Sequence, residues 1–223
     1  MTVSSKMNSL VDQIKSSIPH DSFSDLELAN LLPGSRDRRY SLVKRAIAQG
    51  DLIHLRRGYY SLAEKHRRGA LNLFAISQKI YGPSCVSLES ALSYHGWIPE
   101  AVYTTTCITS QRSRDFHTPL GKFAYQHVPL KVLMVDVERL SPGAETFLMA
   151  RPWRALADYV FVYKKDWKSL RPLMTGLRIE EDLLHSIDVA ELKEIAESYP
   201  SRRVSRFISG VIEEITQAKG GFA

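Results

Sequence analysis

Residues 22–62 constrain the fold of this chain most strongly, because signals for two short helices are followed directly by a glycine turn between two apolar stretches. Ser24 and Glu27 have the spacing of a capping box. Phe23 and Leu28 have the spacing of a hydrophobic staple, so a helix is predicted to begin at Ser24. The residues of this helix that we expect to face the core are Leu26, Ala29 and Leu32.

A second helix is predicted over residues 36–49. Pro33-Gly34 stops the first helix, Ser35 provides an N-cap for the second, and Gly50 ends it. Arg39 falls toward the buried side of this helix. The residues of that side are Leu42, Val43, Ala46 and Ile47. At about 100° per residue, those that project outward are Asp37, Arg38, Ser41, Lys44 and Arg45, with Arg36 in the first turn.

Residues 52–62 predict a β-hairpin with a basic tip. Strand alternation places Ile53 and Leu55 on one face of the first strand, and His54 and Arg56 on the other. Gly58 supplies the positive φ that a tight turn requires. The hairpin follows the second helix without a linker, so we expect the two to pack together as one module.

Two helices followed by a basic hairpin are typical of a winged helix-turn-helix, which places its second helix in the DNA major groove and its wing on the backbone. In the wing, Arg56 and Arg57 are placed for phosphates or the minor groove, and Tyr59 for a hydroxyl contact. The predicted DNA-binding residues are Arg36, Arg38, Ser41, Lys44, Arg45, Arg56, Arg57 and Tyr59.

The charge of the chain is distributed as this interpretation requires. Residues 1–68 hold 12 Lys/Arg against 7 Asp/Glu, whereas residues 69–223 hold 18 against 17. The excess positive charge therefore lies where DNA phosphates would be neutralised. We predict a winged helix-turn-helix domain over residues 1–64 and a second domain over residues 69–223. Within the first domain, an amphipathic helix is expected over 5–18, from the spacing of Met7, Leu10, Val11, Ile14 and Ile18.

Composition indicates a soluble protein of a reducing compartment. No apolar run approaches the roughly 20 residues that span a bilayer. The first ten residues, MTVSSKMNSL, lack the apolar core of a signal peptide. Cys85 and Cys107 are the only cysteines, so a disulfide framework is not expected. We therefore expect a cytoplasmic protein that does not contact membranes.

The second domain is predicted to be α+β and to become helical from about residue 151. Asp188 and Glu191 repeat the capping-box spacing before a later helix. In the first half, the expected helices are 70–80 and 87–95, and the expected strands are 102–108, 123–127, 132–137 and 146–149. The fold class is thus α+β: an N-terminal winged helix-turn-helix, then a mixed α+β domain with a helical C-terminal part.

Sequence motifs for enzymatic chemistry are absent. The chain has no G-x-G-x-x-G, no G-x-x-x-x-G-K-[ST] and no G-x-S-x-G. Cys85, His95, Cys107 and His117 are 10, 12 and 10 residues apart, unlike the closely paired ligands of zinc sites. We therefore expect no catalytic residues, no metal and no cofactor, and we predict that the protein is not an enzyme.

A second basic cluster lies in the link over residues 110–122. It contains Arg112, Arg114, His117 and Lys122. One interpretation is a solvated surface loop. The other is a secondary basic surface, formed by Arg112, Arg114 and Lys122, that extends the DNA footprint or touches RNA or an acidic partner.

Two stretches of the chain share a pattern with a known family. One is the helix-plus-wing segment SLVKRAIAQGDLIHLRRGYYSL. The other is residues 81–128, YGPSCVSLESALSYHGWIPEAVYTTTCITSQRSRDFHTPLGKFAYQHV. The matching positions in the second stretch are Ser90-Ala91-Leu92, His95-Gly96, Thr104 to Thr106, Arg112 and Arg114, and Thr118 to Gly121. Together they resemble the AbiEi family of antitoxins, from bacterial type IV toxin–antitoxin and phage-defence systems, over about half of the chain.

The resemblance implies an N-terminal winged domain that represses its own operon by binding repeated operator sites in double-stranded DNA. It also implies a second domain that counteracts a cognate nucleotidyltransferase-like toxin, with or without direct contact. We expect a monomer or weak dimer in solution that binds DNA cooperatively, with two copies on repeated half-sites.

Three alternatives remain open at the level of sequence. The first is a winged-helix transcriptional regulator whose second domain senses a small molecule. The second is a protein-interaction module whose winged domain binds a partner in place of DNA. The third is an enzyme acting on nucleic acid, which would need a carboxylate or metal cluster that the sequence does not present.

Overall fold

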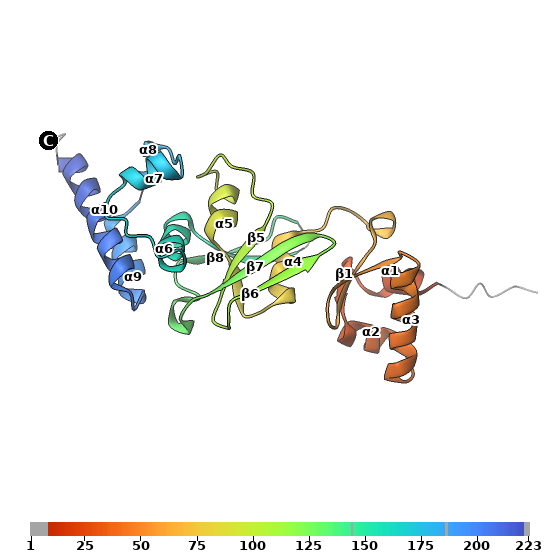
Figure 1. The fold of residues 1–223 in the computed structure, drawn as a ribbon. Helices are drawn as coiled ribbons and strands as arrows, with labels where there is room; N and C mark the ends of the chain where they lie inside the picture. Colours follow the sequence, from red (N-terminus) through yellow and green to blue (C-terminus); the bar gives the residue numbers. More distant parts are fainter. Residues whose placement is uncertain (1–8, 144, 186, 221–223) are drawn as a thin grey trace, which may run out of the picture.

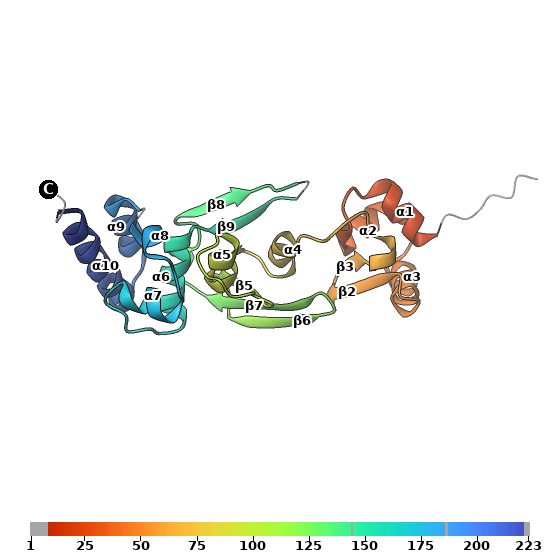
Figure 2. The same cartoon turned by 90° about the horizontal axis from the view of Figure 1, so that it is seen from above.

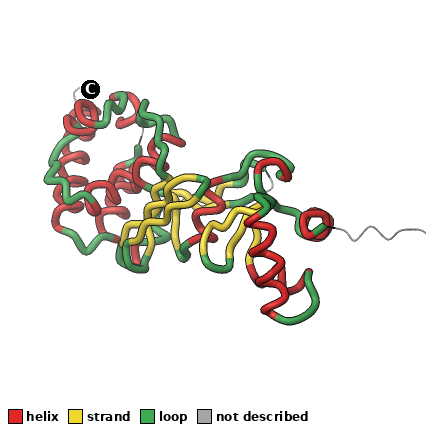
Figure 3. The backbone as a smooth tube through the Cα atoms, turned by 45° about the vertical axis from the view of Figure 1, so that its right-hand side comes forward, coloured by secondary structure: helices red, strands yellow, loops and turns green. Residues whose placement is uncertain are grey.

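The computed structural model describes residues 9–143, 145–185 and 187–220. Its fold is α+β, with helices packed around one small and one larger sheet. The molecule is elongated: an N-terminal part lies at one end, the larger sheet occupies the middle, and the C-terminal helices lie at the other end (Figure 1). Figure 3 shows the strands gathered between these two helical ends.

The N-terminal part consists of three helices and a three-stranded antiparallel sheet of order β1-β3-β2. Its elements are α1 (Leu10–Ser17), β1 (Ser22–Ser24), α2 (Asp25–Leu31), α3 (Arg36–Ala48), β2 (Leu52–Arg56) and β3 (Tyr59–Leu62). One hydrophobic core lies between the helices and the sheet, and it includes Ile14, Phe23, Leu28, Val43 and Leu62.

Side-chain caps fix where these helices begin, as the sequence predicts. The Ser24 hydroxyl accepts a hydrogen bond from the backbone N–H of Glu27, whose carboxylate accepts one in return from the backbone N–H of Ser24. The Ser35 hydroxyl accepts a hydrogen bond from the backbone N–H of Arg38 at 3.3 Å. Both helix starts were predictable because a cap is a contact between near neighbours in the chain.

One prediction for the N-terminal part is wrong, and another lies partly outside the described residues. Leu26 was predicted to face the core, but its side chain is 71% exposed, because Leu28 and Leu32 on the same short helix take the core positions. The helix expected over residues 5–18 is described from Leu10 onward. Residues 5–8, with the expected core residue Met7, lie outside the described residues.

The second part is built on a six-stranded mixed sheet of order β6-β7-β5-β4-β9-β8. The pairs β5–β7 and β4–β9 are parallel, and the other neighbours are antiparallel. Its elements are η1 (Glu64–His66), α4 (Leu73–Ile80), β4 (Ser84–Val86), α5 (Leu88–Tyr94), β5 (Thr105–Thr109), β6 (Arg114–Thr118), β7 (Gly121–His127), η2 (Leu130–Val132), β8 (Val137–Leu140) and β9 (Phe147–Ala150). Helix α4 packs on β4 and β9, and α5 packs on β5.

Three of the six strands, β5, β7 and β9, and the helices α4 and α5 match predicted elements, whereas β4, β6 and β8 were not predicted. The expected strand over 132–137 is wrong: the 3₁₀ turn η2 ends at Val132, and β8 begins only at Val137. Asp136 has a φ of 48°, which is incompatible with a continuous strand. The predicted loop over 110–122 contains the edge strand β6, whose exposed and charged side chains gave no strand signal.

The C-terminal part is helical, as predicted. Its helices are α6 (Pro152–Val162), α7 (Arg171–Gly176), α8 (Glu181–His185), α9 (Val189–Ser198) and α10 (Arg202–Gly220). Helix α6 packs against α5, α9 and α10, and so joins the sheet to the C-terminal helices. Asp188 caps α9 by accepting a hydrogen bond from the backbone N–H of Ala190.

A buried ionic network connects these elements. The Arg154 guanidinium donates to Asp158 Oδ2 at 3.1 Å and to the Tyr199 hydroxyl at 3.0 Å. The Ser87 hydroxyl donates to the same carboxylate oxygen at 2.6 Å, and the Tyr199 hydroxyl donates to Oδ1. Burial lowers the pKa of a guanidinium, but Asp158 and Tyr199 outweigh this effect and raise the pKa of Arg154. The arginine is therefore a permanent buried cation with one paired carboxylate.

Helix α10 contains a glycine where its surface meets the loop before α7. A Cβ atom at Gly210 would lie 1.9 Å from the carbonyl oxygen of Lys168, which is inside any permitted contact distance. The absence of a side chain therefore lets the loop backbone lie directly on the helix. The sequence analysis did not predict this close approach.

The β2–β3 hairpin contributes to two hydrophobic cores at once. Leu52 and Leu62 belong to the core of the N-terminal part. Leu55 and Tyr59 are 4% and 3% exposed and belong to the core of the second part, against which Ile53 also packs. The sheet of the N-terminal part thus has its helices on one face and the second part on the other. The predicted alternation of Ile53 and Leu55 is what separates the two faces.

Two further observations describe the chain as a whole. None of the helices in the described residues is long and apolar enough to cross a membrane. Cys85 and Cys107 are both buried free thiols on the neighbouring strands β4 and β5. Burial raises the pKa of Cys107 to about 12, so this thiol remains protonated.

Candidate nucleic-acid interface

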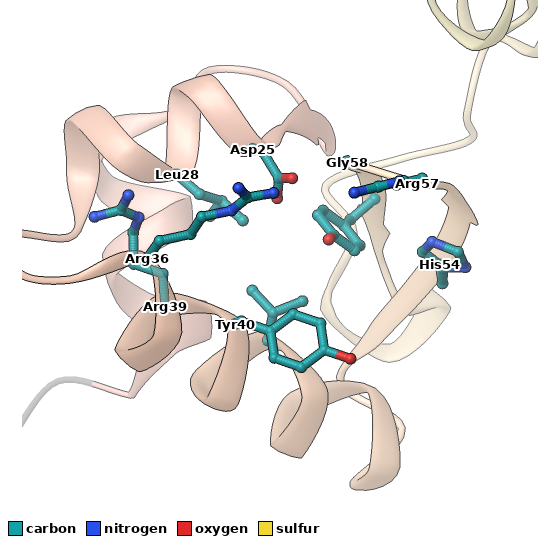
Figure 4. Close-up of a pocket in the computed structure, with 10 residues that line it drawn as sticks. Asp25, Leu28, Arg36, Arg39, Tyr40, His54, Arg57 and Gly58 are labelled. Carbon is teal, nitrogen blue, oxygen red and sulfur yellow. The ribbon is translucent and has the colours of Figure 1, made fainter.

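Helices α2 and α3 and the turn of the β2–β3 hairpin surround a cavity of about 510 Å³ (Figure 4). The residues that line it come from all three elements, and the Arg39 side chain extends across it from α3 toward Asp25. The lining residues are Asp25, Leu28, Arg36, Arg39, Tyr40, Val43, His54, Arg57, Gly58 and Tyr60. We call this space the basic cavity, because it holds three arginines and a single carboxylate.

The arginines of the basic cavity are poorly neutralised by the protein itself. Arg39 is half-buried, and its Nη1 donates to the carbonyl oxygen of Gly34 at 2.6 Å. The side chains of Arg36 and Arg57 are exposed and make no hydrogen bond or ion pair with any residue in the described part of the chain. Two guanidinium groups are therefore free for an anion from outside.

The tip of the hairpin is held against the beginning of α2. The backbone N–H of Asp25 donates to the carbonyl oxygen of Gly58 at 2.9 Å. Gly58 has a φ of +74°, and a Cβ atom there would lie 2.9 Å from Asp25 Oδ2. The positive φ of the turn favours glycine at this position, and a larger residue would also displace the Asp25 carboxylate. The contact fixes Arg57 at the edge of the basic cavity.

Aromatic side chains complete the wall of the basic cavity. Tyr60 is buried, and burial together with the nearby Asp25 carboxylate raises its pKa to about 12, so its phenol stays a neutral hydrogen-bond donor. The His54 ring lies 5.6 Å from the Tyr60 ring, between centroids. Tyr40 on α3 is 65% exposed, which is unusual for a large aromatic side chain without a partner.

The outward side of α3 carries a second set of polar and cationic groups. Arg38, Ser41, Lys44 and Arg45 are all exposed, as the helical spacing predicts. None of these side chains is hydrogen-bonded or ion-paired to another described residue. Arg36, Arg39 and Tyr40 instead face the basic cavity. Helix α3 therefore presents positive charge on two adjacent sides.

Two residues of the β2–β3 hairpin do not have the surroundings that the sequence suggested. The predicted DNA contact from Tyr59 is wrong: its side chain is 3% exposed, and its hydroxyl donates to Ser22 at 2.8 Å. The Arg56 side chain is exposed but already hydrogen-bonded within the protein. Its Nε and Nη2 donate to the carbonyl oxygen of Lys79 at 3.3 and 3.2 Å. Arg56 thus anchors the hairpin to the end of α4.

Two of the three residues of the expected secondary basic surface already interact with other side chains of the protein. Lys122 pairs with Asp115 at 2.7 Å, and the Arg114 guanidinium lies 4.8 Å from the centre of the Phe116 ring. Arg112 is exposed, and its carbonyl oxygen accepts a hydrogen bond from Tyr81. Strand β6 lies against β2, and the β6–β7 hairpin extends toward the N-terminal part (Figure 2).

Sequence reasoning missed five polar or charged residues of the basic cavity: Asp25, Arg39, Tyr40, His54 and Tyr60. Positions 36, 39, 40 and 43 follow helical spacing, so they share one side of α3. That spacing was visible, but the partner surface was not, because Asp25 and Gly58 are far from α3 in the sequence. Among the described residues, no group of three or more His, Cys, Asp or Glu side chains could hold a metal ion.

A second cavity, of about 610 Å³, lies in the second part between the sheet, α5 and the end of α6. Its polar lining includes Glu89, Thr104, Thr106, Lys122, Gln126 and Tyr163. The Tyr163 hydroxyl donates to Glu89 Oε2 at 3.1 Å. Comparison with known proteins gives no assignment for either cavity: no protein-family model matches the chain, and no curated protein matches it.

Proposed function

We propose that the N-terminal part is a winged helix-turn-helix and that it binds double-stranded DNA. The order of its elements supports this proposal: three helices and a three-stranded sheet, with the hairpin β2–β3 following α3 directly. In such modules the second helix of the pair enters the major groove and the hairpin contacts the backbone. Helices α2 and α3 and the β2–β3 hairpin would have these roles here.

The observation that carries the proposal is the set of unneutralised cations on α3 and the hairpin tip. Arg36, Arg38, Lys44, Arg45 and Arg57 have no anionic partner among the described residues. Exposed charges of one sign repel each other, so five of them on neighbouring elements favour an external polyanion. Arg38, Ser41, Lys44 and Arg45 would reach base edges, and Arg36 and Arg57 would hold phosphates.

We further propose that the protein is an antitoxin and autorepressor of a type IV, AbiE-like, toxin–antitoxin operon. The support is the resemblance of residues 81–128 to AbiEi antitoxins. The matched positions lie on elements that are neighbours in the fold: Ser90 to Leu92 on α5, Thr105 and Thr106 on β5, and the 118–121 turn between β6 and β7. Two of the matched positions are also hydrogen-bonded to each other: the Ser90 hydroxyl accepts from the backbone N–H of Thr106 at 2.8 Å.

Two experiments test these two claims separately. Binding of the full-length protein to its own promoter fragment, followed by fluorescence anisotropy, should be tight at low salt and fall steeply as salt rises. Absence of binding in dilute buffer would refute the DNA proposal. Co-expression with the product of the adjacent reading frame, if that product is a toxic nucleotidyltransferase, should restore growth. Growth inhibition that persists would refute the antitoxin proposal.

A second candidate function is a winged-helix regulator whose second domain senses a small molecule, and the cavity of about 610 Å³ favours it. The cavity has both polar and apolar side chains in its lining, and it lies in the part that packs on the reverse face of the β2–β3 hairpin. Glu89→Ala and Gln126→Ala would then alter promoter binding in cell extract but not in purified buffer. Identical behaviour of both variants and wild type in the two media would exclude this function.

A further inference from the structure

The basic cavity has the chemistry of a phosphate site. We infer that it seats one phosphodiester group of the DNA backbone, so that α3 and the wing enclose a phosphate between them. The inference rests on the proposed DNA binding and assigns separate tasks to two sides of α3. The cavity side holds the backbone, and the outward side meets the groove.

Charge and geometry support a phosphate in this place. Arg36 and Arg39 come from successive turns of α3, and Arg57 comes from the hairpin tip on the opposite wall. Guanidinium groups match phosphate oxygens with paired donors, so arginine is favoured over lysine at such sites. Three arginines and the single carboxylate of Asp25 leave two positive charges in the lining, enough for a singly charged phosphodiester.

The floor of the cavity strengthens these interactions. Leu28 and Val43 are 1% and 4% exposed, and they form an apolar base beneath the arginines. A low-dielectric surface at one side reduces the screening that water provides, so a bound phosphate interacts more strongly here than on a flat surface.

Substitutions on the cavity side and on the outward side of α3 should affect DNA binding differently. Phosphate contacts fix position but carry no direct sequence information, whereas contacts to base edges do. Loss of Arg36 or Arg57 should therefore weaken binding to every DNA sequence by a similar factor. Loss of Arg38 or Arg45 should weaken binding to the promoter more than binding to a scrambled duplex.

The test uses the full-length protein, a promoter duplex and a scrambled duplex of equal length and composition. Arg36→Gln and Arg57→Gln should each bind both duplexes about tenfold more weakly or worse. Each should also reduce the log–log salt slope by about 0.9. Arg206→Gln on α10 is the matched control, because Arg206 is exposed and unpaired within the described residues and lies at the far end of the molecule. A selective loss on the promoter, or an unchanged slope, would overturn the inference.

A second readout separates this inference from the proposed DNA binding. Titration with inorganic phosphate should shift the NMR signals of the His54 ring in the wild type, and the shift should be lost in the double variant Arg36→Gln, Arg57→Gln. DNA binding without this phosphate response would refute the cavity assignment alone. A phosphate response without DNA binding would refute the DNA source of the phosphate and assign the site to a free phosphate ligand.

Discussion

Asp158 shows how much of the stability of the second part can depend on a single carboxylate. Asp158→Asn would leave Arg154 charged and fully buried with no anionic partner. Removal of one member of a buried ion pair typically destabilises a protein by about 3–5 kcal/mol. Urea unfolding followed by tryptophan fluorescence should therefore give a free energy of unfolding lower by that amount.

The control for this prediction is Asp166→Asn. Asp166 accepts from Arg203 Nε at 3.1 Å, the same distance as in the buried pair, but its side chain is 73% exposed. Exposed ion pairs contribute at most about 1 kcal/mol. If the two variants lost similar stability, burial would not be the cause, and the role given to Asp158 would be wrong.

The close approach of the Lys168 carbonyl to Gly210 predicts the effect of a substitution at this glycine. In an open helix, Gly→Ala stabilises by roughly 1 kcal/mol, but at Gly210 the new Cβ atom meets the carbonyl oxygen of Lys168. We expect Gly210→Ala to destabilise by about 1–3 kcal/mol, as overpacking does, measured by thermal unfolding. Gly176→Ala, at the end of α7 with no atom near its Cβ position, should be neutral or slightly stabilising. A stabilised Gly210→Ala would contradict the close approach.

Among the elements, helix α2 depends most clearly on its cap. Burial raises the pKa of Glu27, but hydrogen bonds from Ser24 and His20 outweigh it, so the pKa lies below its usual value of 4.5. Ser24→Ala should cost about 1 kcal/mol at neutral pH. Because the folded pKa is lowered, this contribution is present above pH 4.5 and lost as pH falls through the folded value. The difference in free energy of unfolding between wild type and Ser24→Ala should therefore shrink in acid to the part that the Ser24 hydroxyl contributes by accepting from the backbone N–H of Glu27. A difference that stayed constant down to pH 2 would refute the role of the carboxylate.

Elements were predictable from the sequence where their signals are local. Helix caps, the Gly58 turn and the periodicity of α3 involve residues within a few positions of each other, and the structure contains them all. Strands β4, β6 and β8 were missed: β4 has only three residues, and β6 has an exposed, charged edge. The run over 132–137 is rich in apolar residues, of which Val132 and Leu133 are buried, and an apolar run alone does not distinguish a strand from a turn.

The candidate site was predictable only in part, for a related reason. Helical periodicity correctly placed Arg38, Ser41, Lys44 and Arg45 on the exposed side of α3. The burial of Tyr59 could not be anticipated, because the surface that covers it comes from the second part of the chain. A residue's own neighbours in sequence indicate which face of a strand it occupies, but not what packs on that face.

At the scale of the whole molecule, the two parts share a core through the hairpin. Leu55→Ala should remove apolar contacts from the second part and also loosen β2, with a loss of about 2–5 kcal/mol. Hydrogen exchange should therefore accelerate in both α3 and α4. Leu52→Ala, which faces the core of the N-terminal part, should accelerate exchange in α3 but not in α4. If both variants left α4 protected, the two parts would be independent.

Because the β2–β3 hairpin contributes to both hydrophobic cores, exchanging the N-terminal part for that of another protein would disturb the second part. A chimera that replaced residues 9–62 with the DNA-reading module of another regulator would expose the surface that Leu55 and Tyr59 now cover. It would also remove the Arg56 donor from the last turn of α4. Changes of DNA target, in the laboratory or in evolution, are therefore expected to accumulate on the outer flank of α3, while the hairpin is inherited together with the sheet behind it.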